Sequence, residues 1–186
     1  MSISAPSRRP YAAMTLFFGA DDPLSNWHPA RFVYRGMPFV CVEQFMMYCK
    51  ARLFDDMATA GRIMAATHPS DHKRLGREVR PFDNAVWMEK CEGYVRVGCR
   101  EKFWQNPSMA RALLATEGTE LVEASRYDRI WGVGLGKDDP RILDRRQWRG
   151  ANRLGNVLMD VRDILALELD TRPSQGSTRD ACLLPG

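Results

Sequence analysis

The chain has 186 residues, of which 45% are hydrophobic and 27% are charged, as is usual for one globular domain. No run of 18 apolar residues occurs, which excludes a membrane-spanning helix from the prediction. The 27 Lys and Arg residues exceed the 23 Asp and Glu residues by only four, a small excess for a dedicated nucleic-acid binder, although it leaves room for a basic pocket that takes one phosphorylated ligand.

Three segments are predicted along the chain. Residues 1–13 form a flexible arm, residues 14–169 form the folded domain, and residues 170–186, rich in Pro, Ser, Gly and Thr, form a disordered tail. The five cysteines are odd in number and form no CxxC pair, and no signal peptide opens the chain. A cytoplasmic location is therefore predicted, without a membrane partner.

The first half of the domain is predicted to begin with short strands and to continue with helices. Met14–Gly19 is an apolar run that suits a strand, and Ala30–Phe39 suits a hairpin that turns at Arg35-Gly36. Apolar residues spaced by three and four predict a helix over 43–54. Four more helices are predicted at Asp56–Thr67, Pro69 to about Gly76, Asn84–Asn106 and Pro107–Leu114.

The second half contains fewer regular elements. Strands are predicted at Thr119–Ala124 and Arg129–Leu135, on either side of a polar connection, and an apolar stripe predicts a final helix over Ala151–Leu169. Together, these strands and helices predict an α+β fold, a helix-rich single domain with a small sheet of short strands. The regular strand–helix alternation of a doubly wound sheet is missing.

The strongest chemical signal lies on the helix predicted over 43–54. Glu43, Met47 and Lys50 follow one another at i, i+4 and i+7, so they share one face. The carboxylate and the amine can be a structural ion pair or two solvated groups. They can equally be a catalytic pair whose pKa values perturb each other. The spacing leaves both interpretations open.

Two later clusters also offer chemistry. In EASRYDRIWGVGL at 123–135, Asp128 and Trp131 can hold a ribose or a base, or they can be a turn residue and a core residue. In WRGANRLGNVLM at 148–159, backbone N–H groups near Asn152 can receive a phosphate, or the segment is an ordinary helix start. The glycines at 132, 134 and 136 lack the spacing of a phosphate loop and indicate a close approach of backbone.

Other motifs point away from common catalytic classes. His68 and His72 are separated by Pro69 and have no third ligand at a suitable spacing, so no metal site is predicted. No GxSxG motif and no Cys/His dyad is recognised. Five tryptophans are many for one small domain, and about two of them are expected to stack on the base of a ligand.

In this order, the segments resemble the YbiA-like, or NADAR, family, whose second name refers to NAD and ADP-ribose association. The resemblance covers about residues 16–165. It rests on PLSNW at 23–27, F-x-Y-x-G at 32–36, VEQFMMYCKA at 42–51, KRLGREV at 73–79, Trp87, KFWQNPSM-x-x-x-LL at 102–114, LVEASRYDRIWGVGL at 121–135 and W-x-G-x-N-x-LG-x-x-LM-x-VR at 148–162.

The resemblance implies a YbiA-like fold and an N-glycosidase that needs neither metal nor cofactor. It implies two substrate types: ribosylamino-pyrimidine phosphates of the early riboflavin pathway, or ADP-ribosylated guanine in nucleic acid. The alternative is a non-catalytic module that binds ADP-ribose or NAD. By the resemblance, the catalytic residues are Glu43, Lys50 and Asp128, and the substrate-binding residues are Asn26, Trp87, Trp131, Gly132 and Asn152.

Two departures from the family pattern concern substrate preference. Trp27 stands where Phe is common, and Phe45 stands where Tyr or His is frequent.

The implied chemistry uses carboxylates to stabilise an anomeric cation and to protonate a departing nitrogen. Lys50 offers a second route, through a Schiff base with the opened ribose. That route requires a lowered lysine pKa, which burial favours and a nearby Glu43 opposes.

Overall fold

Six α-helices make up about half of the chain that the computed structural model describes, namely residue 11 and residues 13–170. The predicted arm and tail lie outside the described residues, apart from Tyr11, Ala13 and Asp170. The elements are β1 (Ala13–Phe17), β2 (Phe32–Tyr34), β3 (Met37–Phe39), α1 (Val42–Leu53), α2 (Met57–Ala65), α3 (Pro69–Glu78), α4 (Asn84–Gln105), α5 (Pro107–Leu114), β4 (Thr119–Glu123), the 3₁₀ turns η1 (Pro140–Leu143) and η2 (Arg145–Gln147), and α6 (Arg153–Asp170). The predicted helix-rich α+β class is confirmed.

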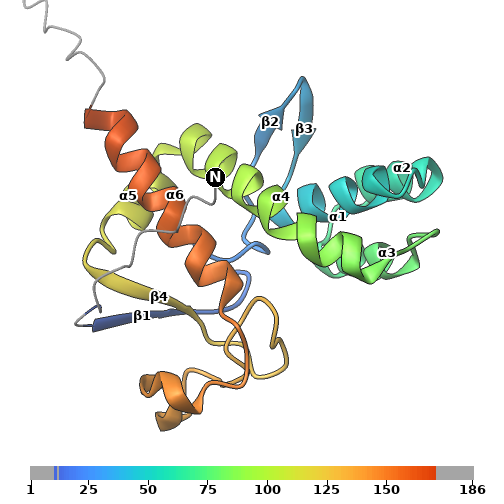
Figure 1. The fold of residues 1–186 in the computed structure, drawn as a ribbon. Coiled ribbons are helices and arrows are strands. Elements are labelled where there is room, and N and C mark those ends of the chain that lie inside the picture. The colour runs from blue at the N-terminus through green and yellow to red at the C-terminus, as the bar shows by residue number, and fades with distance from the viewer. Residues whose placement is uncertain (1–10, 12, 171–186) are drawn as a thin grey trace, which may run out of the picture.

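Helix α4 runs between two lobes of the molecule (Figure 1). One lobe contains α1, α2 and α3, which pack on one another, and α1 also packs on α4. In the other lobe, α6 packs on α4 and β4, and β4 pairs with β1. None of the described helices combines the length and the hydropathy needed to cross a membrane.

The strands form two separate pairs. β1 and β4 are parallel, and their last residues, Phe17 and Glu123, are opposite each other. β2 and β3 form the predicted hairpin, in which Arg35 and Gly36 both have positive φ values of 49° and 77°. Two successive positive φ values suit a tight hairpin turn, and glycine adopts them without steric cost. The pairing of β1 with β4 brings Glu123 to the edge of the site described below.

Helix α1 is fixed in place by contacts along its length. The side chain of Cys41 caps its N-terminus by accepting from the backbone N–H of Gln44 at 3.4 Å. The amide of Gln44 donates to the carbonyl oxygen of Ile63 at the end of α2 (3.1 Å). Phe45 packs edge-on against Phe39, with ring centres 5.0 Å apart. These buried contacts hold α1 rigidly, so the side chains on its face toward α3 are positioned by the core.

The predicted strand over Arg129–Leu135 is wrong, because this segment is an irregular loop. The carboxylate of Asp128 accepts from the N–H groups of Ile130 (2.9 Å) and Trp131 (2.8 Å), which closes a turn at the start of the segment. Gly134 then adopts a φ of +70°. The alternation of apolar residues that suggested a strand instead reflects burial of the loop beside β4.

Candidate active site

Glu43 lies in the first turn of α1, and its side chain is almost fully buried at 4% exposure. Its backbone N–H donates to the carbonyl oxygen of Asn26 at 3.0 Å, which ties α1 to the preceding loop. The indole of Trp27, from the same loop, hydrogen-bonds to the Glu43 carboxylate. An indole N–H can only donate, so Trp27 stabilises the charged form of Glu43.

Two further carboxylates lie close to Glu43. Glu123 ends β4, and Asp128 follows five residues later in the adjoining loop. Burial, with repulsion from Asp128 as a further cause, raises the pKa of Glu43 to about 7. Burial raises the pKa of Glu123 to about 8, with repulsion from Asp128 and Glu43 added to it. Carboxylates that share a buried site cannot all ionise, so this carboxylate cluster holds protons near neutral pH.

One carboxylate oxygen of Glu123, Oε2, is buried and has no hydrogen-bond partner among the described residues. An unpaired buried oxygen of this kind is costly when charged, which agrees with the raised pKa of Glu123. Glu123 was not among the site residues predicted from the sequence. Its place at the end of a buried strand, just before a loop rich in functional residue types, was the available signal.

Lys73 of α3 supplies positive charge to the carboxylate cluster. Its Nζ lies 4.0 Å from Oδ2 of Asp128 and 5.8 Å from the centre of the Trp27 ring. Its charge lowers the pKa of both Glu43 and Glu123, although burial outweighs it at both. Lys73 was also missed in the sequence prediction, because contact between α1 and α3 is not readable from the pattern of either helix.

Lys50 lies at the other end of the same face of α1. Its Nζ donates to the carbonyl oxygen of Gly76 at 2.7 Å and lies 4.1 Å from the ring centre of Phe82 and 5.7 Å from that of Trp87. Burial lowers the pKa of Lys50, and the nearby charge of Arg80 lowers it further. The neutral amine is therefore favoured more than in an exposed lysine.

The structure does not join Lys50 to Glu43. Seven residues of helix separate them by about 10 Å along the axis, and the buried side chain of Met47 fills the space between α1 and α3. A Cβ atom on Gly76 would lie 2.0 Å from the Met47 sulfur, so only glycine allows this approach. The side chain of Lys50 forms no ion pair with a carboxylate in the described part of the chain.

Asn152 and Gly132 shape the loop around the carboxylate cluster. Asn152 is buried, and its amide donates to the carbonyl oxygen of Leu121 (2.8 Å) and accepts from the N–H of Glu123 (3.0 Å). Its side chain is thus committed to the backbone of β4. A Cβ atom on Gly132 would lie 2.9 Å from the carbonyl oxygen of Glu123. Both residues position the end of β4, in agreement with the close backbone approach expected of the glycines.

The other predicted binding residues are distributed around these two regions. Asn26 is buried, and its side-chain oxygen accepts from the thiol of Cys99 at 3.6 Å. Trp87 lies at the Lys50 end and stacks on Tyr94, with ring centres 6.2 Å apart. Trp131 is half-buried beside Asp128, to whose carboxylate its backbone N–H donates. The two tryptophans therefore belong to opposite ends of the α1 face.

A cysteine and a histidine do meet, although no such dyad was recognised in the sequence. The sulfur of Cys41 lies 3.6 Å from Nδ1 of His72, and both side chains are buried. Burial raises the pKa of Cys41 to about 11 and lowers that of His72. Both groups are thus neutral near pH 7, which fits a structural hydrogen bond and not a reactive thiolate. The described residues include no cluster of His, Cys, Asp and Glu arranged to hold a metal ion.

Comparison with known proteins gives consistent matches. The NADAR domain model matches residues 16–166. Protein irg-1 of Caenorhabditis elegans is 38% identical over 90% of this chain and 85% of its own length. N-glycosidase R617 of Acanthamoeba polyphaga mimivirus is 40% identical over 75% of this chain and 85% of its own length. Riboflavin biosynthesis protein VVA0006 of Vibrio vulnificus is 32% identical over 76% of this chain, which corresponds to 35% of that longer protein.

A solved structure shares the fold. The NMR structure of the Escherichia coli protein YbiA aligns with 91% of this chain and 95% of its own length, with a TM-score of 0.73 and 25% sequence identity. The predicted resemblance to YbiA-like, or NADAR, proteins is therefore confirmed, and so is the fold class that it implied.

Proposed function

The chain belongs to the NADAR domain family and is an N-glycosidase, and we propose that the carboxylate cluster of Glu43, Glu123 and Asp128 is its reaction centre. Cleavage of a ribosyl–nitrogen bond needs a proton for the departing nitrogen and negative charge near the anomeric carbon. The observation that carries the proposal is the burial of Glu43 and Glu123 together, which raises their pKa values to about 7 and about 8. Near neutral pH, this pair can supply a proton and still retain negative charge.

Asp128 and Lys73 have supporting roles in this scheme. Oδ1 of Asp128 accepts from the turn that follows it, whereas Oδ2 faces Lys73 at 4.0 Å. Oδ2 is the oxygen proposed to accept a ribose hydroxyl. Lys73 holds this carboxylate in place and offsets part of the negative charge of the carboxylate cluster.

Lys50 is assigned the nucleophilic role, which requires its amine to leave the carbonyl oxygen of Gly76 and turn toward the carboxylate cluster. Protonation of the ribose ring oxygen opens the ring and leaves an iminium bond between C1′ and the nitrogen of the base. The neutral Lys50 amine adds to C1′, and the base departs as its amine after taking up a proton. Water then hydrolyses the lysine imine, which releases the ribose as an aldehyde and restores the lysine. The lowered pKa of Lys50, which burial and the nearby charge of Arg80 cause, supports this role.

Two substrates are proposed, and a separate observation favours each. The ribosylamino-pyrimidine phosphates of early riboflavin synthesis are favoured by the name of the Vibrio vulnificus relative. ADP-ribosylated guanine in nucleic acid is favoured by a local excess of positive charge, since residues 126–149 contain seven Lys and Arg residues against four Asp residues. In either case the base is proposed to stack on one of the two tryptophans, Trp87 at the Lys50 end or Trp131 beside Asp128.

The proposed reaction uses only side chains of residues 14–169. The substrate is small or is a modified base in nucleic acid, and no membrane takes part. The four cysteines in the described part of the chain are free thiols. Free thiols favour a reducing compartment, so the cytoplasm is the proposed location.

The test is hydrolysis of both substrates by the purified protein, with Glu43→Ala as the site variant and Glu117→Ala, which changes an exposed residue, as the matched control. We expect release of ribose 5-phosphate from the pyrimidine substrate or of ADP-ribose from the oligonucleotide. Either activity should be lost in Glu43→Ala and retained in Glu117→Ala. Binding of ADP-ribose without turnover of either substrate would contradict the proposal and support the binding module instead.

A further inference from the structure

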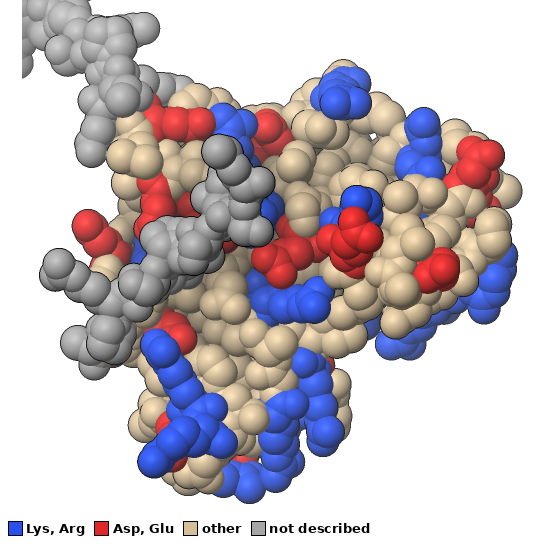
Figure 2. Space-filling view, viewed as in Figure 1, with Lys and Arg blue, Asp and Glu red and all other residues tan. Residues whose placement is uncertain are grey.

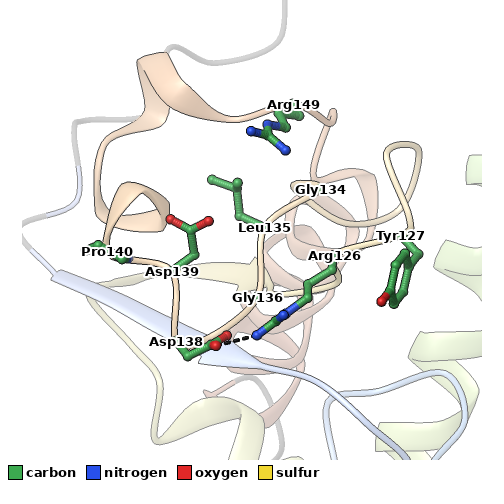
Figure 3. Close-up of a pocket in the computed structure, with 9 residues that line it drawn as sticks. All are labelled: Arg126, Tyr127, Gly134, Leu135, Gly136, Asp138, Asp139, Pro140 and Arg149. Atoms are coloured by element: carbon green, nitrogen blue, oxygen red, sulfur yellow. Dashed lines mark hydrogen bonds and ion pairs between the residues drawn. The ribbon is translucent and has the colours of Figure 1, made fainter.

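A cavity of about 590 Å³ lies along the loop that follows the carboxylate cluster (Figure 3). None of Glu43, Glu123 and Asp128 lines it. Its walls come from the segment that contains Asp128 and from the chain before α6. They include Arg126, Gly134, Gly136, Asp138, Asp139 and Arg149. A volume of this size is typical of a pocket for a small molecule.

The cavity is tied to the carboxylate cluster by backbone hydrogen bonds. The N–H of Val133 donates to the carbonyl oxygen of Glu123 at 3.0 Å, and the N–H of Arg149 donates to the carbonyl oxygen of Val133 at 2.9 Å. Two such steps of a hydrogen-bonded ladder place the Arg149 backbone about 10 Å from that of Glu123. A guanidinium on this backbone is within reach of a group attached to a ribose that is bound at Glu123.

The two arginines of the cavity retain unused donors. Arg126 forms an ion pair with Asp138 through a single nitrogen, although a guanidinium has five N–H donors. Asp139 forms an ion pair with Arg141, whose Nη2 lies 2.7 Å from Oδ2 of Asp139. Arg149 forms no ion pair within 4.0 Å in the described residues, although its charge contributes to the lowered pKa of Asp139. Asp138 and Asp139 are therefore each paired with one arginine, Arg126 and Arg141. The guanidinium groups of Arg126 and Arg149 keep N–H donors that can bind an anion.

Glycine backbone allows the arginines to lie close to the loop. Figure 3 shows Arg149 near Gly134 and Arg126 beside Gly136. A Cβ atom on Gly134 would lie 3.0 Å from Cβ of Arg149, and one on Gly136 would lie 2.6 Å from Nε of Arg126. A side chain at either position would therefore displace an arginine from the cavity.

The charge of the chain is concentrated around this cavity. Residues 126–149 account for three of the four net positive charges of the whole sequence. Lys and Arg side chains gather on the lobe that contains η1 and η2, at the bottom of the view (Figure 2). Such a concentration attracts phosphate to this lobe and not to the molecule as a whole.

We propose that the cavity bounded by Arg126 and Arg149 is the phosphate subsite of the enzyme and takes a phosphate ester of the ribosyl substrate. This assignment rests on the proposed function, because it joins the cavity and the carboxylate cluster into one binding site. The phosphate is either the monoester of a ribosyl phosphate or the diester chain of an ADP-ribosylated oligonucleotide. In both cases Arg149, which has no competing carboxylate pair, provides the main contact.

The test compares Arg149→Gln with Arg146→Gln. Arg146 belongs to η2, pairs with Asp144 at 2.9 Å and does not line the cavity, so it is a matched control. Ribose 5-phosphate and ribose serve as probes in a titration followed by NMR. We expect Arg149→Gln to weaken binding of ribose 5-phosphate by about tenfold or more, because a hydrogen bond to a charged group contributes at least that much. Ribose binding, and both titrations of Arg146→Gln, should match the wild type.

Turnover by the same variants distinguishes the source of the phosphate. A raised KM of Arg149→Gln for the ribosylamino-pyrimidine phosphate indicates a monoester, and a raised KM for the modified oligonucleotide alone indicates a diester. Unchanged binding of ribose 5-phosphate by Arg149→Gln would overturn the subsite, as would an equal loss for ribose. Failure of the proposed function would be recognised separately, because the wild type itself would then release no base.

Discussion

Glu43 and Lys50 stand on one face of α1, seven residues apart, and burial shifts their pKa values in opposite directions. At the first end, the indole of Trp27, the charge of Lys73 and two further carboxylates surround Glu43, whose pKa rises to about 7. At the second end, Lys50 lies against Phe82 and Trp87, and its pKa falls. The surroundings differ in kind, since one end is crowded with charge and the other with aromatic rings.

The comparison shows that one physical cause can prepare two opposite kinds of group. Removal from water disfavours whichever form is charged, so it leaves a carboxyl protonated and an amine neutral. The first can then donate a proton, and the second can attack carbon. A direct ion pair between Glu43 and Lys50 would have the reverse effect, because it would stabilise both charged forms. Met47 keeps the two groups apart, so each keeps the uncharged form that the proposed reaction needs.

The largest effect is expected from substitution of the amine. Lys50→Arg keeps a positive charge but removes the proposed nucleophile, so turnover should be abolished. Lys73→Arg is the matched variant, because it changes the lysine beside the carboxylates. It should stay within about tenfold of wild type, since a half-exposed ion pair contributes at most about 1 kcal/mol. Steady-state kinetics check both variants, and equal losses would remove the distinction between the two lysines.

Removal of the proposed proton donor, Glu43, is expected to have the next largest effect. Glu43→Gln keeps the shape and polarity of the side chain but cannot exchange a proton, so kcat should fall by about 100- to 10,000-fold. The fold should persist, because a neutral amide replaces a carboxyl that is already buried. Circular dichroism and thermal unfolding serve as the control for folding. A variant that folds and turns over at the wild-type rate would show that the proton comes from elsewhere, with Glu123 as the first residue to examine.

The smallest effect should come from Trp27→Phe. The indole hydrogen bond lowers the pKa of Glu43, so Trp27→Phe should raise it. The protonated form then persists to higher pH, and the alkaline limb of the rate profile should shift upward. One hydrogen bond to a charged group corresponds to about one pH unit. A rate profile of Trp27→Phe that coincides with that of wild type would show that Glu43 does not set the alkaline limb.

Much of the fold could be predicted, because helix spacing is a local property. The helices around residues 43–54 and 84–106 follow from periodic apolar residues and from boundary residues such as Pro107. The strand predicted over Arg129–Leu135 failed for an equally local reason, since Asp128 closes a turn and Gly134 takes a positive φ. Alternating apolar residues do not distinguish a strand from a buried loop when the flanking residues form turns.

The candidate site was harder to predict than the fold. The shared face of Glu43 and Lys50 follows from helical spacing, and the resemblance to known proteins supplied Asp128. Glu123 and Lys73 depend on which elements pack together, and the burial that shifts each pKa depends on the whole tertiary structure. The commitment of the Asn152 side chain to the backbone of β4 is likewise a long-range contact, 31 residues away from Leu121.

The most direct test of the account is reductive trapping during turnover. Cyanoborohydride reduces a lysine imine to a stable amine, and mass spectrometry of the digested protein then locates the ribosyl adduct. The account predicts the adduct on Lys50, its loss in Lys50→Arg and its retention in Lys73→Arg. An adduct on Lys73, or full turnover without any adduct on lysine, would contradict the claim that the two ends of the α1 face act on one ribosyl group.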